Sequence, residues 1–224
     1  MAVLILNGEM NLDQLLAALS QKQSQIYFMQ VGAFDGVTND HLHREVRKFS
    51  LSGVAIEPQK DAFKLLQKNY SDLAATMTFF NVAIAERDGY KPFHFVDNAP
   101  AEPVWLPQLA SFRRDVILRH SDAVQDLDAL IRSVNIECWS FETLFRKLNR
   151  TTVDLLYIDA EGYDGKLIWS FDVPRRMPSI IVFEHKHLMA PEYLQVLQML
   201  TGCGYSIGLS RKNIHDTIAS RVFR

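Results

Sequence analysis

The sequence has only two cysteines, no long apolar run and no excess of basic residues. Cys138 and Cys203 lie far apart and lack the spacing of a metal or redox motif, so we expect buried thiols in a reducing compartment, with a disulfide as the lesser alternative. The apolar run at residues 3–6 is too short for a signal peptide, and no other run approaches the length of a membrane span. We therefore expect a cytoplasmic protein that does not associate with membranes.

The charge balance argues against nucleic-acid binding. The chain carries 24 Lys and Arg residues against 26 Asp and Glu residues, a formal net charge of -2, whereas a nucleic-acid-binding surface usually shows as a basic stripe. Hydrophobic residues make up 48% of the chain, which is typical of a globular protein and not of a disordered one. The length of 224 residues fits one α/β domain. We expect a single domain over residues 1–224, with residues 1–24 as a helical extension.

Short apolar segments alternate with amphipathic ones, which predicts a mostly parallel sheet with helices on both faces. The expected strands cover residues 26–31, 53–56, 77–84, 153–158 and 179–183, and a closing hairpin covers residues 205–209 and 214–222. The expected helices cover residues 41–49, 62–70, 140–148, 164–169 and 191–200. Residues 97–135 interrupt this pattern, and we expect either a lid or acceptor-binding insertion or a purely structural excursion.

Polar residues follow several of these strands at the point where each strand ends. Asp159 and Glu161 follow the strand at residues 153–158. A glycine turn of sequence GAFDG follows the first strand at residues 32–36, and Glu57 follows the second strand. Because ligands of open α/β sheets bind just beyond the carboxyl ends of the strands, we expect these residues to line one crevice.

The glycine turn limits the class of ligand. The spacing of Gly32 and Gly36 does not match the dinucleotide fingerprint, which disfavours an NAD-type oxidoreductase, and no Lys-Ser/Thr pair follows Gly36, which excludes a P-loop. Glu57 lies about two dozen residues after the turn, the separation expected of an acidic residue that binds ribose hydroxyls. The alternative is that Glu57 only caps the following helix.

Taken together, these motifs resemble the FkbM-type methyltransferase family, which uses S-adenosylmethionine and has the class I methyltransferase fold. The resemblance covers residues 25–219 and rests on VGAFDG at 31–36, IEP at 56–58, NVAI at 81–84, DLLYIDAEGYD at 154–164 and IVFEH at 181–185. It implies a Rossmann-like α/β three-layer sandwich with a mostly parallel seven-stranded sheet, in the order 3-2-1-4-5-7-6 with strand 7 antiparallel. It also implies methyl transfer to a hydroxyl on a small molecule, a sugar or a secondary metabolite. A cofactor-binding domain of the same fold without turnover is the alternative.

The resemblance also implies which residues hold the cofactor. The turn at residues 32–36 would hold the methionine part of S-adenosylmethionine, Glu57 the ribose hydroxyls, and residues 81–83 the adenine. The full implied set is Gln30, Gly32, Ala33, Asp35, Gly36, Asn39, Glu57, Pro58, Asn81, Val82, Ala83 and Asp159.

Gln30 departs from the family's pattern, since many members carry an acidic residue before the glycine turn. That carboxylate usually accepts hydrogen bonds from the ammonium group of the cofactor. Glutamine keeps an acceptor oxygen but lacks the charge. Asp35 or Asp159 could supply the missing charge.

Methyl transfer to a hydroxyl benefits from a general base that removes the hydroxyl proton. The candidates are Asp159, Glu161 and His185, because crowded carboxylates raise one another's pKa and histidine titrates near neutral pH. We interpret His187 as a surface or capping residue and Asp164 as the N-cap of the following helix.

No motif demands a metal ion, so none is expected. The side chains that would form a mixed oxygen and nitrogen site for Mg²⁺ or Mn²⁺ at neighbouring strand ends are Asp159, Asp164, Glu184 and His185.

Overall fold

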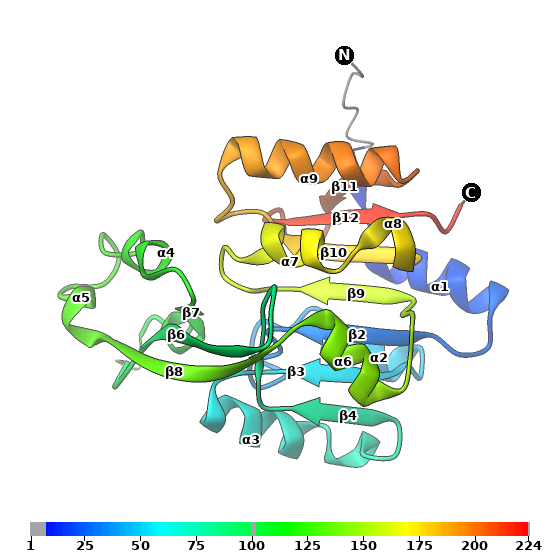
Figure 1. Ribbon diagram of the computed structural model, residues 1–224. Coiled ribbons are helices and arrows are strands. Elements are labelled where there is room, and N and C mark those ends of the chain that lie inside the picture. Colours follow the sequence, from blue (N-terminus) through cyan, green and yellow to red (C-terminus); the bar gives the residue numbers. More distant parts are fainter. Residues whose placement is uncertain (1–7, 100–101, 224) are drawn as a thin grey trace.

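The computed structural model describes residues 8–99 and 102–223, so the apolar run at residues 3–6 lies outside the described residues. Its main sheet has eight described strands in the order β4-β3-β2-β9-β10-β12-β11-β1 (Figure 1). Their bounds are β1 Glu9–Met10, β2 Tyr27–Val31, β3 Ser52–Ile56, β4 Met77–Phe80, β9 Leu155–Ile158, β10 Ile180–Glu184, β11 Ser206–Ser210 and β12 Asp216–Ser220. Strand β12 is antiparallel to both of its neighbours, and the other pairings are parallel. The sheet is therefore mixed, and β11 and β12 form the expected antiparallel pair.

The expectation of seven strands is wrong by one strand. From β4 to β11 the strands follow the expected order, but β1 adds an eighth strand at the edge and pairs in parallel with β11. The amide of Leu209 donates to the carbonyl of Gly8, and the amide of Arg211 donates to that of Met10. A two-residue strand is too short to show the alternation of side chains by which strands are recognised, so the sequence pattern could not reveal it.

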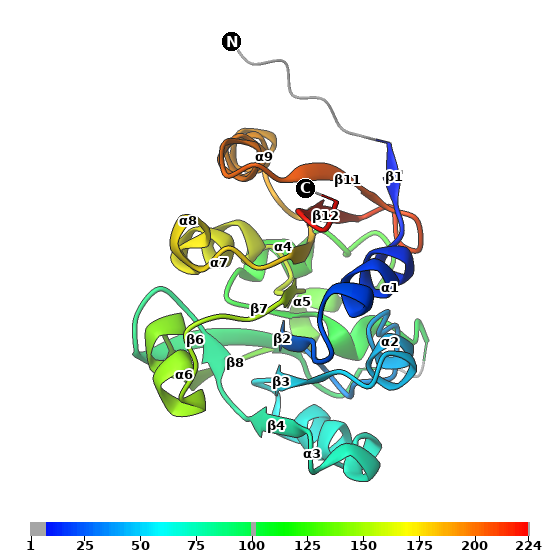
Figure 2. The ribbon, with the colours of Figure 1, turned by 90° about the vertical axis from the view of Figure 1, so that its right-hand side faces the viewer.

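Helices cover both faces of the main sheet (Figure 2). One face carries α1 Leu12–Lys22, α2 His43–Lys48 and α3 Lys60–Asn69, and the other carries α6 Phe141–Leu148, α7 Asp164–Ser170, α8 Val173–Arg176 and α9 Ala190–Gly202. Within β9, Leu155 packs into the core on one face and Leu156 into the core on the other. An uninterrupted apolar strand is what burial on both faces requires.

A second sheet of four described strands, in the order β5-β8-β6-β7, lies beyond the main one. It contains β5 Ala83–Ile84, β6 Gly89–Val96, β7 Ala110–Ser111 and β8 Ile131–Trp139, and the short elements near it are η2 Leu106–Gln108, α4 Arg114–Leu118 and α5 Leu127–Leu130. The ribbon of β6 and β8 projects on the side to which the arrows of β3 and β9 point (Figure 1). This second sheet therefore stands beside the carboxyl ends of the main strands.

The single strand expected over residues 77–84 is wrong, because the chain changes sheets within it. Strand β4 ends at Phe80, and Ala83 begins β5 in the second sheet. Between them, the side-chain amide of Asn81 donates to the backbone carbonyls of Glu57 and Pro58, at 2.8 and 3.1 Å. These bonds hold the chain at the crossing point.

The helices and the cysteines can be compared with what the sequence predicts. In residues 8–99 and 102–223, no helix combines the length and the apolar character that crossing a membrane requires. Both cysteines are free: Cys138 is buried, as expected, and Cys203 is partly buried.

Gly53 allows β2 and β3 to pack closely, because it lies beside the fully buried Phe28. A methyl group on Gly53 would lie 2.4 Å from a ring carbon of Phe28 and 2.5 Å from its carbonyl oxygen. We expect Gly53→Ala to lower the free energy of unfolding by about 1–3 kcal/mol, measured by chemical denaturation. The control is Gly202→Ala, where the added methyl meets no described atom within 4 Å. Equal stabilities of the two variants would contradict this account of the packing.

Candidate active site

A cavity of about 380 Å³ lies at the carboxyl ends of the central strands. The main sheet and the loops after its strands supply one wall: Gln30, Val31, Gly32, Ala33, Phe34, Thr38, Asn39, Asp40, Ile56, Glu57, Pro58, Tyr157, Asp159, Ala160, Glu161 and Glu184. The second sheet and the insertion supply another: Val82, Ala83, Ile84, Phe93, Trp105, Gln108, Leu109, Ala110, Phe112 and His120. Polar groups thus meet largely apolar side chains, as in most small-molecule sites.

The turn after β2 packs tightly against the end of β9. Gly32 has a φ of 81°, and a Cβ atom there would lie 1.8 Å from the carbonyl oxygen of Asp159. The amides of Gly32 and Ala33 both donate to the carbonyl oxygen of Ile56, at 3.0 and 3.1 Å. The position accepts only glycine, which fixes the first loop of the cavity against the neighbouring strands.

Asp35 turns back on its own loop. Its carboxylate accepts hydrogen bonds from the amides of Val37 and Thr38, at 2.9 and 2.7 Å. Neither Asp35 nor Gly36 belongs to the cavity wall among the described residues, whereas Asn39 does. Asp35 therefore shapes the loop and does not bring its charge to the cavity.

Gln30 has an acidic neighbour that the sequence analysis missed. Its side-chain amide donates to Asp40 Oδ2 at 3.2 Å, and its own Oε1 is buried without a hydrogen-bond partner among the described residues. The other oxygen of Asp40 accepts from the amides of Leu42 and His43, at the start of α2. Burial raises the pKa of Asp40, and these hydrogen bonds lower it. In the sequence, Asp40 is marked only by its position before a helix, and that position is equally typical of a residue that caps the helix.

Glu57 joins the loops after β2 and β3. Its Oε2 accepts from the amide of Phe34 at 2.8 Å, and its Oε1 from the amide of Gln59 at 2.7 Å. The side chain is buried, and this burial raises the pKa of Glu57 to about 7 although both hydrogen bonds lower it. Asn81 lies outside the cavity wall, and its side-chain amide instead donates hydrogen bonds to the backbone carbonyls of Glu57 and Pro58.

Four carboxyl groups crowd the ends of β9 and β10. Asp159 is exposed to the cavity, but the surrounding protein limits its hydration and raises its pKa, and Glu161 and Asp164 raise that pKa further. Burial raises the pKa of Glu184 to about 11, with contributions from the same three carboxylates. Asp164 is fully buried and accepts hydrogen bonds from the amides of Ala160 and Gly162, both at 3.2 Å. The N-cap position of α7 belongs to Tyr163 and not to Asp164, so that assignment was wrong by one residue.

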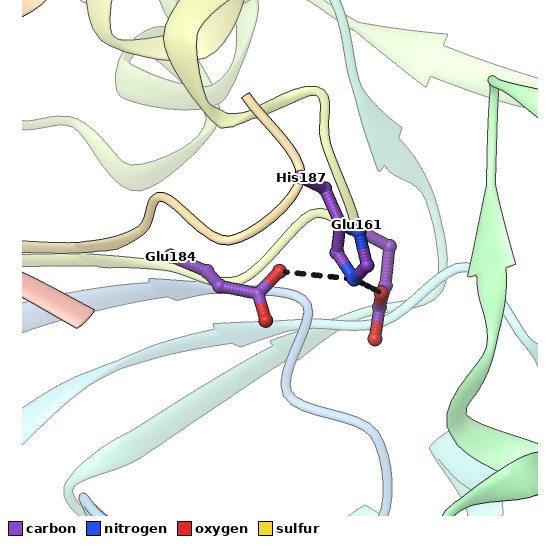
Figure 3. A group of neighbouring side chains, drawn as sticks. All are labelled: Glu161, Glu184 and His187. Atoms are coloured by element: carbon purple, nitrogen blue, oxygen red, sulfur yellow. Dashed lines mark ion pairs between the residues drawn. The ribbon is translucent and has the colours of Figure 1, made fainter. Parts of the chain in front are cut away.

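The two histidines after β10 do not have the surroundings that the sequence predicts. His185 is outside the cavity wall: its Nδ1 lies 3.0 Å from Thr217 Oγ1, and its ring stacks on Tyr193 with a centroid distance of 4.9 Å. His187, interpreted as a surface or capping residue, is buried, and its Nε2 lies between Glu161 and Glu184 (Figure 3). No metal site was expected, and the four side chains named as the alternative set, Asp159, Asp164, Glu184 and His185, are not the ones brought together. The grouped side chains are Glu161, Glu184 and His187.

Among the comparisons with known proteins, a family model matches the larger part of the chain. The model of the methyltransferase FkbM domain matches residues 30–207. No curated protein matches the chain. Similar solved structures include the methyltransferase domain of METTL16, with 9% identity, a TM-score of 0.48, and coverage of 95% of this chain and 65% of that one. An O-methyltransferase from Bacillus cereus in complex with SAH has 8% identity, a TM-score of 0.44, and coverage of 96% and 84%. Precorrin-6y C5,15-methyltransferase from Geobacter metallireducens has 11% identity, a TM-score of 0.43, and coverage of 93% and 87%.

Asp164 makes stability depend on pH. Burial raises the pKa of this carboxyl from 3.8 to about 8 in the folded protein, although the backbone amides that bind it lower the pKa. Because the folded carboxyl keeps a proton that the unfolded one loses, its contribution to stability is complete below about pH 4 and is lost as the pH rises through about 8. Between about pH 5 and 7, each rise of one pH unit lowers the contribution of Asp164 to the free energy of unfolding by about 1.4 kcal/mol.

Denaturation across this pH range checks the assignment. The free energy of unfolding of the wild-type protein should fall more steeply with pH than that of Asp164→Asn, whose amide is neutral throughout. Parallel profiles for the two proteins would mean that Asp164 is ionised in the folded state.

Proposed function

Because the chain belongs to the FkbM methyltransferase domain family, we propose that it transfers a methyl group from S-adenosylmethionine to a hydroxyl oxygen of a small molecule, a sugar or a secondary metabolite. The observation that carries this proposal is the cavity at the strand ends, where the Gly32 turn, Glu57 and Asp159 lie in one wall. All three lie within the part of the chain that matches the family.

The neighbourhood of Gln30 fits the ammonium group of the methyl donor. The buried Oε1 of Gln30 has no partner in the described part of the chain, and an acceptor of this kind is costly unless a donor reaches it. Asp40, which is bound to the amide of the same side chain, supplies a carboxylate at this point of the cavity. The charge that Gln30 lacks would thus come from the start of α2, and not from Asp35.

Glu57 fits the ribose hydroxyls. Each of its oxygens accepts one backbone hydrogen bond, which fixes the carboxyl group and leaves further lone pairs for two neighbouring hydroxyls. Val82 and Ala83 add apolar surface next to it for the adenine. Asn81 would act indirectly, because it holds the backbone on which Glu57 and Pro58 stand.

The insertion fits the acceptor. Trp105, Phe112 and His120 come from residues 97–135 and line the cavity opposite the main sheet. We therefore assign the acceptor side to this segment and to the second sheet, where Phe93 adds another aromatic ring. Aromatic faces beside a few polar groups suit a sugar or a metabolite ring.

Asp159 is the proposed general base. When bound, S-adenosylmethionine supplies a methyl group on a positively charged sulfur. The chain would hold the acceptor hydroxyl in line with that methyl group, and Asp159 would take the hydroxyl proton. The raised pKa of Asp159 suits a base that must accept a proton near neutral pH. Glu161 faces the same cavity and would hold the acceptor, whereas His185 lies outside the cavity wall.

A domain that binds the cofactor without turnover is the second candidate, because Gln30 stands where a carboxylate is usual. Transfer of label from methyl-labelled S-adenosylmethionine to a panel of hydroxyl-bearing metabolites separates the two functions. Labelled product supports the enzyme. Binding of the cofactor with no product from any acceptor supports the second candidate.

Calorimetric titration tests the assignment of Glu57. We expect S-adenosylhomocysteine to bind and NAD not to bind. Glu57→Gln should weaken S-adenosylhomocysteine binding by about 1–3 kcal/mol, because an acceptor for the ribose hydroxyls becomes a donor. The matched control is Glu9→Gln, an exposed carboxylate on β1 that should leave the affinity unchanged. Equal affinities of the two variants would remove Glu57 from the ribose site.

A further inference from the structure

Three side chains from two loops meet at the ends of β9 and β10: Glu161 and Glu184 line the cavity, and the buried His187 is not part of its wall. Glu161 follows β9, Glu184 ends β10, and His187 comes three residues later. The Nε2 atom of His187 lies 3.3 Å from Glu161 Oε2 and 3.9 Å from Glu184 Oε2, so the imidazole nitrogen stands between the two carboxylates (Figure 3). The side chain of His187 is 5% exposed. All three of these atoms are buried and lack a hydrogen-bond partner among the described residues.

A shared proton does not account for this arrangement. Charge-assisted hydrogen bonds between a nitrogen and a carboxylate are about 2.7–2.9 Å long, and both distances exceed that range. A metal ion does account for it, because ligand atoms about 2.0–2.2 Å from one ion lie about 3–4 Å from one another. The three atoms all lie within 4.8 Å of each other.

We propose that Glu161, Glu184 and His187 bind a divalent transition-metal ion. Two carboxylate oxygens and one imidazole nitrogen form a mixed set. The imidazole suits Zn²⁺ and the carboxylates suit Mn²⁺, whereas Mg²⁺ and Ca²⁺ prefer oxygen ligands throughout. A divalent cation also offsets the repulsion among the carboxylates at the ends of β9 and β10.

The loops that carry the ligands are held in place by the protein itself. The amides of Ala160 and Gly162, on either side of Glu161, donate to the buried carboxyl of Asp164. Ser111 Oγ donates to the carbonyl oxygen of Glu161 at 2.8 Å, and Glu161 has a φ of 46°. A left-handed backbone at a non-glycine residue costs about 1–3 kcal/mol and persists where the surroundings impose it. The ligand geometry is thus set before any ion binds.

The His187 loop is supported in the same way. Arg119, from the insertion, donates to the carbonyl oxygen of His187 at 3.2 Å. The ring of His120 packs against that of His187 with a centroid distance of 5.4 Å. The insertion therefore closes over one side of the proposed ion.

The ion would face the acceptor side of the cavity, an assignment that rests on the proposed function. Glu161 and Glu184 both line the cavity, and three protein ligands leave coordination positions open. A hydroxyl oxygen bound there would lose its proton more readily, with Asp159 in the same wall to receive it. In this arrangement Glu161 binds the ion, and Asp159 accepts the proton of the hydroxyl.

Binding of Mn²⁺ to the metal-free full-length chain tests the site. The protein is dialysed against a chelator and then titrated with MnCl₂, while the electron paramagnetic resonance signal of free Mn²⁺ is followed. We expect one Mn²⁺ per chain, and at least tenfold weaker binding by Glu161→Gln. The control is Glu137→Gln, an exposed carboxylate on β8 outside the cavity wall, which should bind as the wild type does.

Glu184→Gln supplies a second readout that also confirms folding. Without metal, this variant should fold and give one cooperative melting transition, because glutamine has nearly the same size and shape as the glutamate it replaces. Added MnCl₂ should raise the melting temperature of the wild type and leave that of Glu184→Gln unchanged. The proposal is overturned if neither MnCl₂ nor ZnCl₂ raises the melting temperature of the wild type, or if Glu161→Gln and Glu137→Gln bind Mn²⁺ equally. Neither methyl donor nor acceptor is present, so the result is independent of S-adenosylhomocysteine binding.

Discussion

Mutual repulsion among Asp159, Glu161, Asp164 and Glu184 is the constraint on which the site depends, because two adjacent parallel strands bring all four carboxyl groups to one end of the sheet. The surroundings of each carboxyl group reduce this repulsion in a different way. Asp164 accepts hydrogen bonds from two backbone amides, and burial raises its pKa. Asp159 faces the cavity, where a proton can reach it. Glu161 and Glu184 flank an imidazole nitrogen that has no other described partner. Together these arrangements bring the proposed base and the proposed cation site to neighbouring strand ends.

The strand ends were predictable because their signal is local. An apolar run that stops at polar residues marks a buried strand, and parallel strands in such a sheet end on the same side. This reasoning located the Gly32 turn, Glu57, Asp159 and Glu161, which all lie in the cavity wall. The steric need for Gly32 comes from its φ of 81° and from the carbonyl oxygen of Asp159, which would lie 1.8 Å from a Cβ atom at this position.

The residues that were missed depend on loop conformation, which has no periodicity to read. His185 and His187 follow the same strand two residues apart, and the turn after β10 decides which of them meets Glu161. Asp40 reaches Gln30 only because the loop after β2 folds back before α2 begins. The change from the main sheet to the second sheet was missed because the chain leaves the main sheet at Phe80, inside one continuous apolar segment.

A crystal structure of the chain grown with S-adenosylhomocysteine tests most directly the claim that this cavity holds the methyl donor. The account predicts the ribose hydroxyls at Glu57, the ammonium group beside Gln30 Oε1 and Asp40, and the sulfur directed toward the wall that carries Asp159 and Glu161. A ligand bound outside this cavity, or bound within it without contact to Glu57, would contradict the account.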